Sequence, residues 1–135
     1  MKSLLIALIL IVGIICDQNW ITYGTGLADM PYQNQVPEFK QGCLFLSCCV
    51  VGGLGTKDEA LAARSWALSN GYITDSNWVN DKTKLPQDIA SHFGTTYHSD
   101  FQIKKDQDSA GHTHFWVADS SGKEIFNSAG LGWHR

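Results

Sequence analysis

The sequence has few charged residues, and they form no basic cluster. Charged residues make up 17% of the 135 positions, the net charge at pH 7 is −3, and the lysines are scattered along the chain. Nucleic-acid binding depends on basic side chains gathered on one surface, so we expect no nucleic-acid partner. Hydrophobic residues make up 44% of the chain, which is enough for a buried core and too much for a disordered chain.

Internal repeats, low-complexity tracts and long linkers rich in proline, glycine or serine are also missing. Such features separate one domain from the next, and the length of this chain is within the usual range of one domain. We therefore expect a single domain over residues 17–135.

An apolar run long enough for an ordinary membrane span is missing as well. The longest run covers residues 4–15, whereas a transmembrane helix needs about 20 residues. Lys2 precedes this run and Asp17 follows it, an order typical of a secretory signal peptide. The sequence therefore predicts a signal peptide over residues 1–16, a secreted or periplasmic protein, and membrane contact through this segment only.

Cysteines are few. One of the four, Cys16, belongs to the predicted signal peptide. Three cysteines remain: Cys43, Cys48 and Cys49. Three is an odd number, so at least one thiol stays unpaired within the chain in an oxidising compartment. A disulfide between the neighbours Cys48 and Cys49 would be strained, and both fit better as helix residues. An unpaired thiol in an exported protein indicates reactivity.

Hydrophobic spacing and end signals predict three helices. The run CLFLSCCVV over residues 43–51 is apolar on nearly every face and ends at two glycines. This pattern fits a short buried helix at the centre of the domain, with a buried strand as the alternative. A capping box of Thr56 and Glu59 starts a second helix, which Gly71 ends, and a third covers residues 86–93.

The segments outside these helices are polar or alternate in polarity. Residues 17–40 predict an irregular arm, and Trp78 and Val79 are expected to anchor the loop before the third helix. Extended structure is predicted over residues 95–103, 112–119 and 123–127, with Ser120-Ser121-Gly122 as a hairpin turn. Helices followed by antiparallel strands describe an α+β domain, with a central helix packed against a C-terminal sheet.

Cys43 follows Gly42 at the predicted start of the central helix. A helix N-terminus and a nearby imidazolium favour the thiolate, which is the nucleophilic form. The free amides there can donate to an oxyanion, and the missing side chain of Gly42 lets a substrate approach the sulfur. We therefore predict that Cys43 is a nucleophile with a lowered pKa; a buried apolar cysteine is the alternative.

A histidine and an asparagine in the predicted sheet complete the site. His114 lies in the apolar part of its strand, on the face shared by His112 and Trp116. Asn127 ends the next strand, one hairpin away, and can accept the second N–H of the imidazole. At an exposed strand end, this bond would contribute only about 1 kcal/mol to folding. A core histidine satisfied by backbone is the alternative for His114.

Together these residues resemble the papain-like cysteine peptidase superfamily, in the compact form of the bacteriocin-leader peptidases and of small phage and bacterial proteins. The resemblance covers residues 31–128, through Pro31-Tyr32, Gln35, QGCLF, LPQDIASHFG and HFWVADSSGKEIFNS. It implies a papain-like fold and hydrolysis of a peptide or amide bond, in which Cys43 attacks the carbonyl, His114 acts as base and acid, and Asn127 orients the imidazole. It also implies a glutamine in the oxyanion hole, either Gln35 or Gln41.

Three other interpretations stay open. The order of cysteine and histidine also fits a cell-wall amidase or endopeptidase of the NlpC or CHAP type, which would act on peptidoglycan peptides. A catalytically inactive papain-like fold would serve as a binding protein. Zinc could be held by Cys48, Cys49, His112 and His114, but adjacent cysteines on a helix point about 100° apart. We expect no metal and no cofactor.

Overall fold

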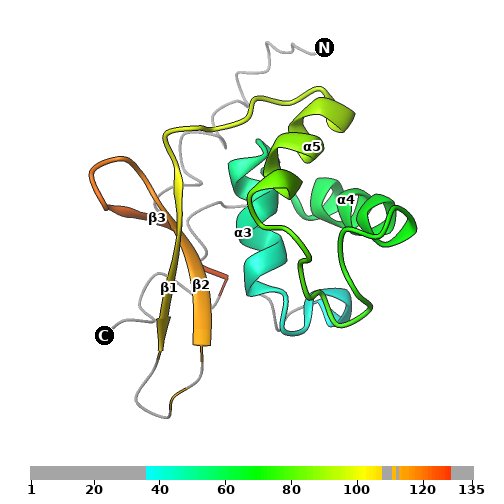
Figure 1. Cartoon of the computed structure of the whole chain (residues 1–135), viewed down its shortest axis with the longest axis horizontal. Helices are drawn as coiled ribbons and strands as arrows, with labels where there is room; N and C mark the ends of the chain where they lie inside the picture. The colour runs from blue at the N-terminus through cyan, green and yellow to red at the C-terminus, as the bar shows by residue number, and fades with distance from the viewer. Residues whose placement is uncertain (1–35, 108–110, 112, 129–135) are drawn as a thin grey trace.

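The computed structural model describes residues 36–107, 111 and 113–128. The predicted signal peptide over residues 1–16 and most of the predicted arm lie outside these residues. Figure 1 shows the elements in chain order: the 3₁₀ helix η2 (Pro37–Phe39), the helices α3 (Cys43–Val51), α4 (Lys57–Ser69) and α5 (Lys84–Phe93), and the strands β1 (Gln102–Gln107), β2 (Thr113–Ala118) and β3 (Glu124–Phe126). In this described part, α-helices precede a three-stranded antiparallel sheet, which confirms the predicted α+β class.

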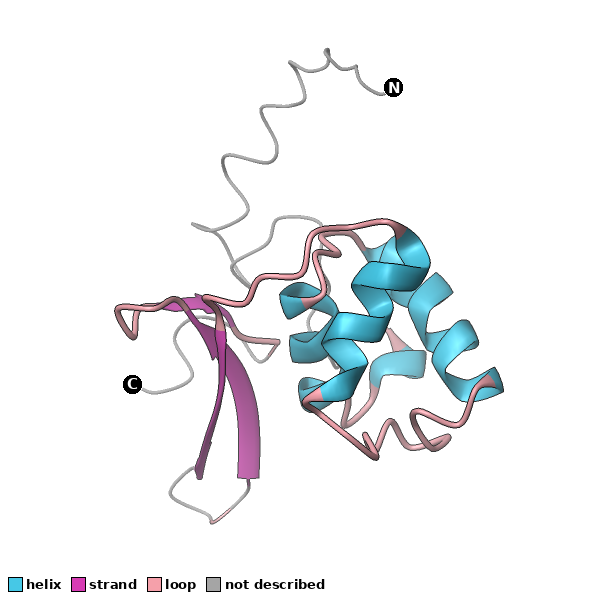
Figure 2. Ribbon diagram, turned by 45° about the horizontal axis from the view of Figure 1, so that its top comes forward, coloured by secondary structure: helices cyan, strands magenta, loops and turns pink. Residues whose placement is uncertain are grey.

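Helix α3 lies at the centre of the molecule. It packs against the sheet on one side and against α4 and α5 on the other, as Figures 1 and 2 show. Every residue of α3 after Cys43 is buried, as expected for a helix that is apolar on all faces. The predicted bounds of this helix are confirmed, and the alternative of a buried strand is wrong. No helix among the described residues is long and apolar enough to cross a membrane.

The segment after α5 caps the C-terminal end of α3 by hydrogen bonds to its carbonyls. The amide of His98 donates to the carbonyl of Val51 at 2.8 Å, and Oγ1 of Thr95 donates to the carbonyl of Gly52 at 2.6 Å. The last carbonyls of a helix need such partners, because no further turn of the helix reaches them. The predicted strand over residues 95–103 is therefore wrong over most of its length, and β1 begins later.

The ends of the other helices follow their sequence signals. Oγ1 of Thr56 accepts a hydrogen bond from the amide of Glu59 at 3.1 Å, and Oε1 of Glu59 accepts one from the amide of Gly55 at 2.9 Å. The predicted capping box is thus confirmed. Helix α5 begins two residues before the predicted start, because the Asp81 carboxylate accepts hydrogen bonds from two amides at the helix start, each 3.0 Å long. Gly94, at φ +71°, ends α5 as expected.

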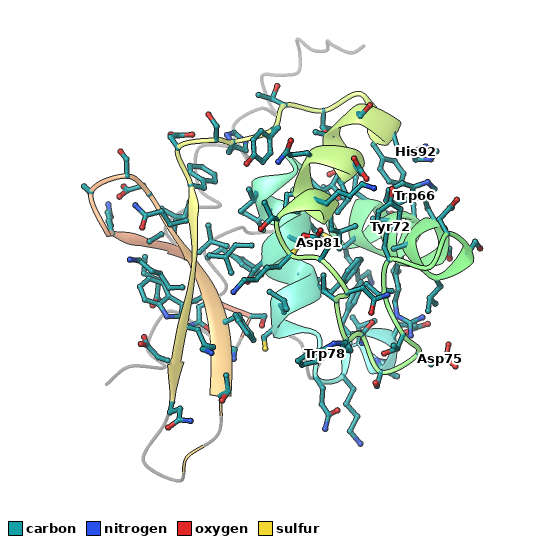
Figure 3. All side chains as sticks on the ribbon, in the orientation of Figure 1. Trp66, Tyr72, Asp75, Trp78, Asp81 and His92 are labelled. Atoms are coloured by element: carbon teal, nitrogen blue, oxygen red, sulfur yellow. The ribbon has the colours of Figure 1, made fainter. Side chains whose placement is uncertain are left out.

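Aromatic rings join α4 to α5 on the outer side of the helical layer. Trp66 of α4 stacks on Tyr72 and on His92 of α5, with ring centroids 4.8 and 4.7 Å apart (Figure 3). Trp78 is 64% exposed, so its predicted role as an anchor is wrong. Val79 is buried, as expected.

Strand β2 is the middle strand of the sheet. It pairs with β1 along its whole length, with Ile103 opposite Val117 and Lys105 opposite Phe115. Strand β3 pairs with β2 only near the end of β2, where Phe126 lies opposite Val117. The first part of β2 therefore has no strand partner on its β3 side among the described residues.

The predicted hairpin turn between β2 and β3 is confirmed. The amide of Asp119 donates to the carbonyl of Lys123 at 2.9 Å. The Asp119 carboxylate in turn accepts hydrogen bonds from the amides of Ser121 and Lys123 at 2.9 and 3.0 Å. These bonds, and above all that from the Ser121 hydroxyl, lower the pKa of Asp119.

Candidate active site

Cys43 is the first residue of α3 and directly follows a tight turn. The turn consists of η2, Gln41 at φ +59°, and Gly42. The Gly42 amide donates to the carbonyl of Phe39 at 2.8 Å, and a Cβ on Gly42 would lie 2.7 Å from the same oxygen. Only glycine fits such a close approach of backbone to backbone. The turn thus requires Gly42 for its own packing, and it sets the position of the thiol.

Burial dominates the electrostatics of the Cys43 thiol. It raises the pKa of Cys43, and it outweighs the backbone hydrogen bonds from Phe115, Leu44 and Cys43 itself, which lower that pKa. The predicted lowering of the pKa is therefore wrong. The amides at the helix start do act on the sulfur, but removing the thiolate from water has the larger effect. A base that accepts the thiol proton would therefore assist the attack by the sulfur.

His114 and Asn127 are in direct contact, as predicted. Nε2 of His114 lies 2.6 Å from Oδ1 of Asn127, and both side chains are buried. An amide oxygen only accepts hydrogen bonds, so Nε2 carries the proton and Nδ1 is the basic nitrogen of the neutral ring. Asn127 is 0% exposed, so the prediction of an exposed strand-end bond is wrong.

Strand β2 links Cys43 to the His114–Asn127 pair. The amide of Phe115 forms a hydrogen bond with Cys43, while β1 occupies the other edge of β2 at this residue. Asn127 directly follows β3, which lies on the same side of β2 as the thiol. The structure therefore brings Cys43 to the residue next to His114, on the edge toward Asn127.

One of the two glutamines predicted for the oxyanion hole, Gln41, lies among the described residues. Gln35 lies outside the described residues. Gln41 precedes Gly42 and lines the same cavity as Cys43. Gln41 is therefore the glutamine that the structure brings to the cavity of the thiol.

A cavity of about 440 Å³ opens beside Cys43. Pockets that bind small ligands have volumes of about 300–1,000 Å³. The start of α3, the loop before α5, and strands β1 and β2 form the walls, with Cys43, Leu44, Trp78, Lys105, Thr113 and Phe115 among the lining residues. Trp78 lies near the end of α3 at which the helix starts (Figure 3). The cavity thus combines an apolar surface with a thiol and a few polar groups.

Asn77 connects the cavity wall to the turn before Cys43. Its Nδ2 donates to the carbonyls of Glu38 and Lys40 at 2.9 and 3.0 Å, and its Oδ1 accepts a hydrogen bond from Nε of Arg64 at 2.9 Å. The side chain is buried, and the backbone lies at φ +68°. Asparagine in a polar loop predicts a turn, but no local signal marks bonds to residues so far away in the chain.

The thiols of Cys48 and Cys49 are buried in α3, and burial raises the pKa of both. Among the described residues, no three His, Cys, Asp or Glu side chains lie close enough to hold one metal ion. His112, another of the candidate zinc ligands, lies outside these residues.

Comparison with protein-family models, with curated proteins and with solved structures found no match to the chain. The chemistry of the site is therefore inferred from its own residues and their geometry.

Proposed function

We propose that the chain is a papain-like thiol hydrolase that cleaves a peptide or amide bond with Cys43, His114 and Asn127. The observation that carries this proposal is the buried contact of 2.6 Å between Nε2 of His114 and Oδ1 of Asn127, next to the strand residue whose amide contacts the thiol. An imidazole that a second side chain orients beside a thiol is the arrangement used in nucleophilic catalysis. A central helix that starts at the cysteine and packs on the strand with the histidine further supports this proposal.

The first step is attack on the substrate. Asn127 keeps the proton on Nε2, so Nδ1 of His114 accepts the proton of the thiol while the sulfur attacks the carbonyl carbon. A carbon–sulfur bond forms, and the carbonyl π electrons move onto the oxygen. The amides at the start of α3 and the side-chain amide of Gln41 can donate hydrogen bonds to this oxyanion. We assign Gln41 rather than Gln35 to that role because Gln41 lines the cavity of the thiol.

The second step releases the products. His114 gives its proton to the leaving amine as the carbon–nitrogen bond breaks, which leaves a thioester on Cys43. Water then attacks the thioester with His114 as the base, the carboxylic acid leaves, and the proton returns to the sulfur. Because burial raises the pKa of Cys43, this sequence requires His114 to accept the proton of the thiol.

A cleavage assay tests this function. The full chain is incubated with a peptide library, and new peptide ends are identified by mass spectrometry. We expect cleavage that Cys43→Ala abolishes and that Cys48→Ala retains. Cys48→Ala is a matched control, because it removes a buried thiol from the same helix. Cleavage that survives in Cys43→Ala would contradict the proposal.

A second substrate separates the related functions. Purified peptidoglycan is offered in parallel with the peptide library, which suits the secreted or periplasmic location that the N-terminal segment predicts. Cleavage of peptidoglycan alone would identify a cell-wall amidase or endopeptidase. Binding of peptides without any cleavage would identify an inactive papain-like protein and overturn the hydrolase.

A further inference from the structure

The cavity beside Cys43 has a positive charge in one wall. Lys105 lines the cavity from β1 and lies opposite Phe115 in the pairing of β1 with β2. Among the described residues that line the cavity, Lys105 is the one with a formally charged side chain. The Lys105 side chain is exposed.

A second lysine lies against the ring of Phe115. Nζ of Lys82, in the loop before α5, lies 5.7 Å from the centroid of the Phe115 ring. Phe115 lines the cavity, whereas Lys82 lines a separate pocket with Tyr97 and Phe101, so Lys105 supplies the charge in the cavity wall. Charge complementarity of this kind attracts an anionic group and repels a cationic one.

The other walls favour an occupant with an apolar stem. Leu44, Trp78 and Phe115 present apolar surface to the cavity. The volume of about 440 Å³ leaves ample room for one amino-acid side chain. Among natural side chains, glutamate combines methylene groups that can contact these walls with a carboxylate that can reach Lys105.

We infer that this cavity selects peptide substrates with an acidic side chain near the bond that is cleaved, and that Lys105 determines this preference. The inference rests on the proposed function, because the cavity adjoins the attacking sulfur. Without Lys105, the apolar walls would accept the stem of a glutamate and of a lysine about equally well.

Peptidyl chloromethyl ketones test the preference without requiring turnover. In this reaction His114 accepts the thiol proton, while the Cys43 sulfur displaces chloride from the methylene carbon and forms a carbon–sulfur bond. Three peptide series carry Glu, Gln or Lys at each position in turn on an otherwise alanine peptide. The full chain is labelled with each, mass spectrometry identifies the labelled residue, and the rate at Cys43 is measured. A chloromethyl ketone without a peptide gives the reference rate.

We expect one position at which the Glu peptide labels Cys43 about 5-fold faster than the Lys peptide, as expected for a partly exposed charge pair. Lys105→Glu should bring this ratio to one or below. Lys104→Glu is the matched control: it changes the net charge equally, but Lys104 lies opposite Trp116, whose side chain is on the other face of β2 from Phe115. The ratio should survive in this control.

The outcomes separate the inference from the function on which it rests. Fast labelling by all three series without a charge preference would leave the hydrolase standing and overturn the role of Lys105. An equal change of the ratio in Lys104→Glu and Lys105→Glu would also overturn it, because the effect would then come from net charge. Labelling by every peptide at only the reference rate, with no cleavage of the library, would overturn both.

Discussion

Replacement of Asn77 should loosen the turn that positions Cys43. Asn77→Gly removes the side chain that bonds to Arg64 and to the carbonyls of Glu38 and Lys40. One hydrogen bond contributes a net ~0.5–1.5 kcal/mol to stability, so three give a loss of ~1.5–4.5 kcal/mol. This loss is a large share of the total stability of a domain, which is about 5–15 kcal/mol.

Asn77→Ala should destabilise the protein more than Asn77→Gly does. The backbone of Asn77 lies at φ +68°, which asparagine tolerates better than alanine because its short polar side chain can bond locally. The left-handed conformation costs alanine about 1–2 kcal/mol. Part of this difference is offset because glycine makes the unfolded chain more flexible, by about 0.4–1 kcal/mol. The alanine variant should therefore be about 1 kcal/mol less stable than the glycine variant.

Urea unfolding followed by tryptophan fluorescence measures both effects. Ser76→Ala, an exposed neighbour in the same loop, is the control and should change the free energy of unfolding by no more than about 0.5 kcal/mol. The rate of Cys43 alkylation should also change in folded Asn77→Gly, because the turn before Cys43 loses its side-chain support. A glycine variant as stable as the wild type would refute the reasoning about these three hydrogen bonds.

Three further predictions follow from single contacts. Asn127→Ala should lower the free energy of unfolding by about 1–3 kcal/mol, because it leaves a buried ring nitrogen without this acceptor. It should also reduce turnover further than Asn127→Asp, which keeps an acceptor. Thermal melts and kcat/KM measure the two effects, and a loss of activity no larger than the loss of folded protein would contradict the prediction. The free energy of unfolding should fall as the pH rises above about 8.5, since thiols of the unfolded chain ionise there while burial keeps Cys49 protonated in the folded state. Urea unfolding near neutral pH and at about pH 10 measures this fall. The fall should be smaller in Cys49→Ala, and an equal fall in this variant would contradict the reasoning. Thr56→Ala should lower the free energy of unfolding by about 1 kcal/mol, because the Glu59 amide loses its acceptor. Lys57→Ala, a change at an exposed position, should have little effect in the same urea assay. Equal losses of stability in the two variants would contradict the role of Thr56 as a helix cap.

The helices could be predicted because their signals act over short distances. The apolar run of α3, the Thr56 capping box and the left-handed Gly94 each involve residues within one or two helical turns. The start of α5 was less predictable, because it depends on how the Asp81 carboxylate is oriented. Local chemistry therefore determined most of the helical layer.

The first strand could not be placed from the sequence. Thr95 and His98 fit an extended segment, but their hydrogen bonds go to carbonyls at the end of α3. This is a choice between two partners that are distant in the chain, and no periodic pattern encodes it. The strand that does form, β1, has mostly exposed residues, so it lacks the clear alternation that marks a half-buried strand.

The candidate site was predictable where one hairpin connects its parts. His114 and Asn127 lie on either side of the Asp119 turn, so strand pairing brings them together. The pKa of Cys43 was not predictable, because it depends on burial by separate elements that pack around the thiol. The role of Asn77 was not predictable either, because its partners are distant in the sequence.

The transfer of the Cys43 proton to His114 is the step on which the proposed chemistry depends. It is tested most directly by the pH dependence of alkylation at Cys43, with iodoacetamide as the reagent and mass spectrometry to locate the label. Wild type and His114→Gln are compared, and His98→Gln serves as a control that removes a histidine elsewhere. We expect the wild type to react near neutral pH, because His114 accepts the proton of the thiol as the sulfur attacks. His114→Gln should react only as the thiol itself ionises, above its ordinary pKa of ~8.5, because burial raises the pKa of Cys43. Identical pH profiles for wild type and His114→Gln would contradict the assignment of His114 as the base.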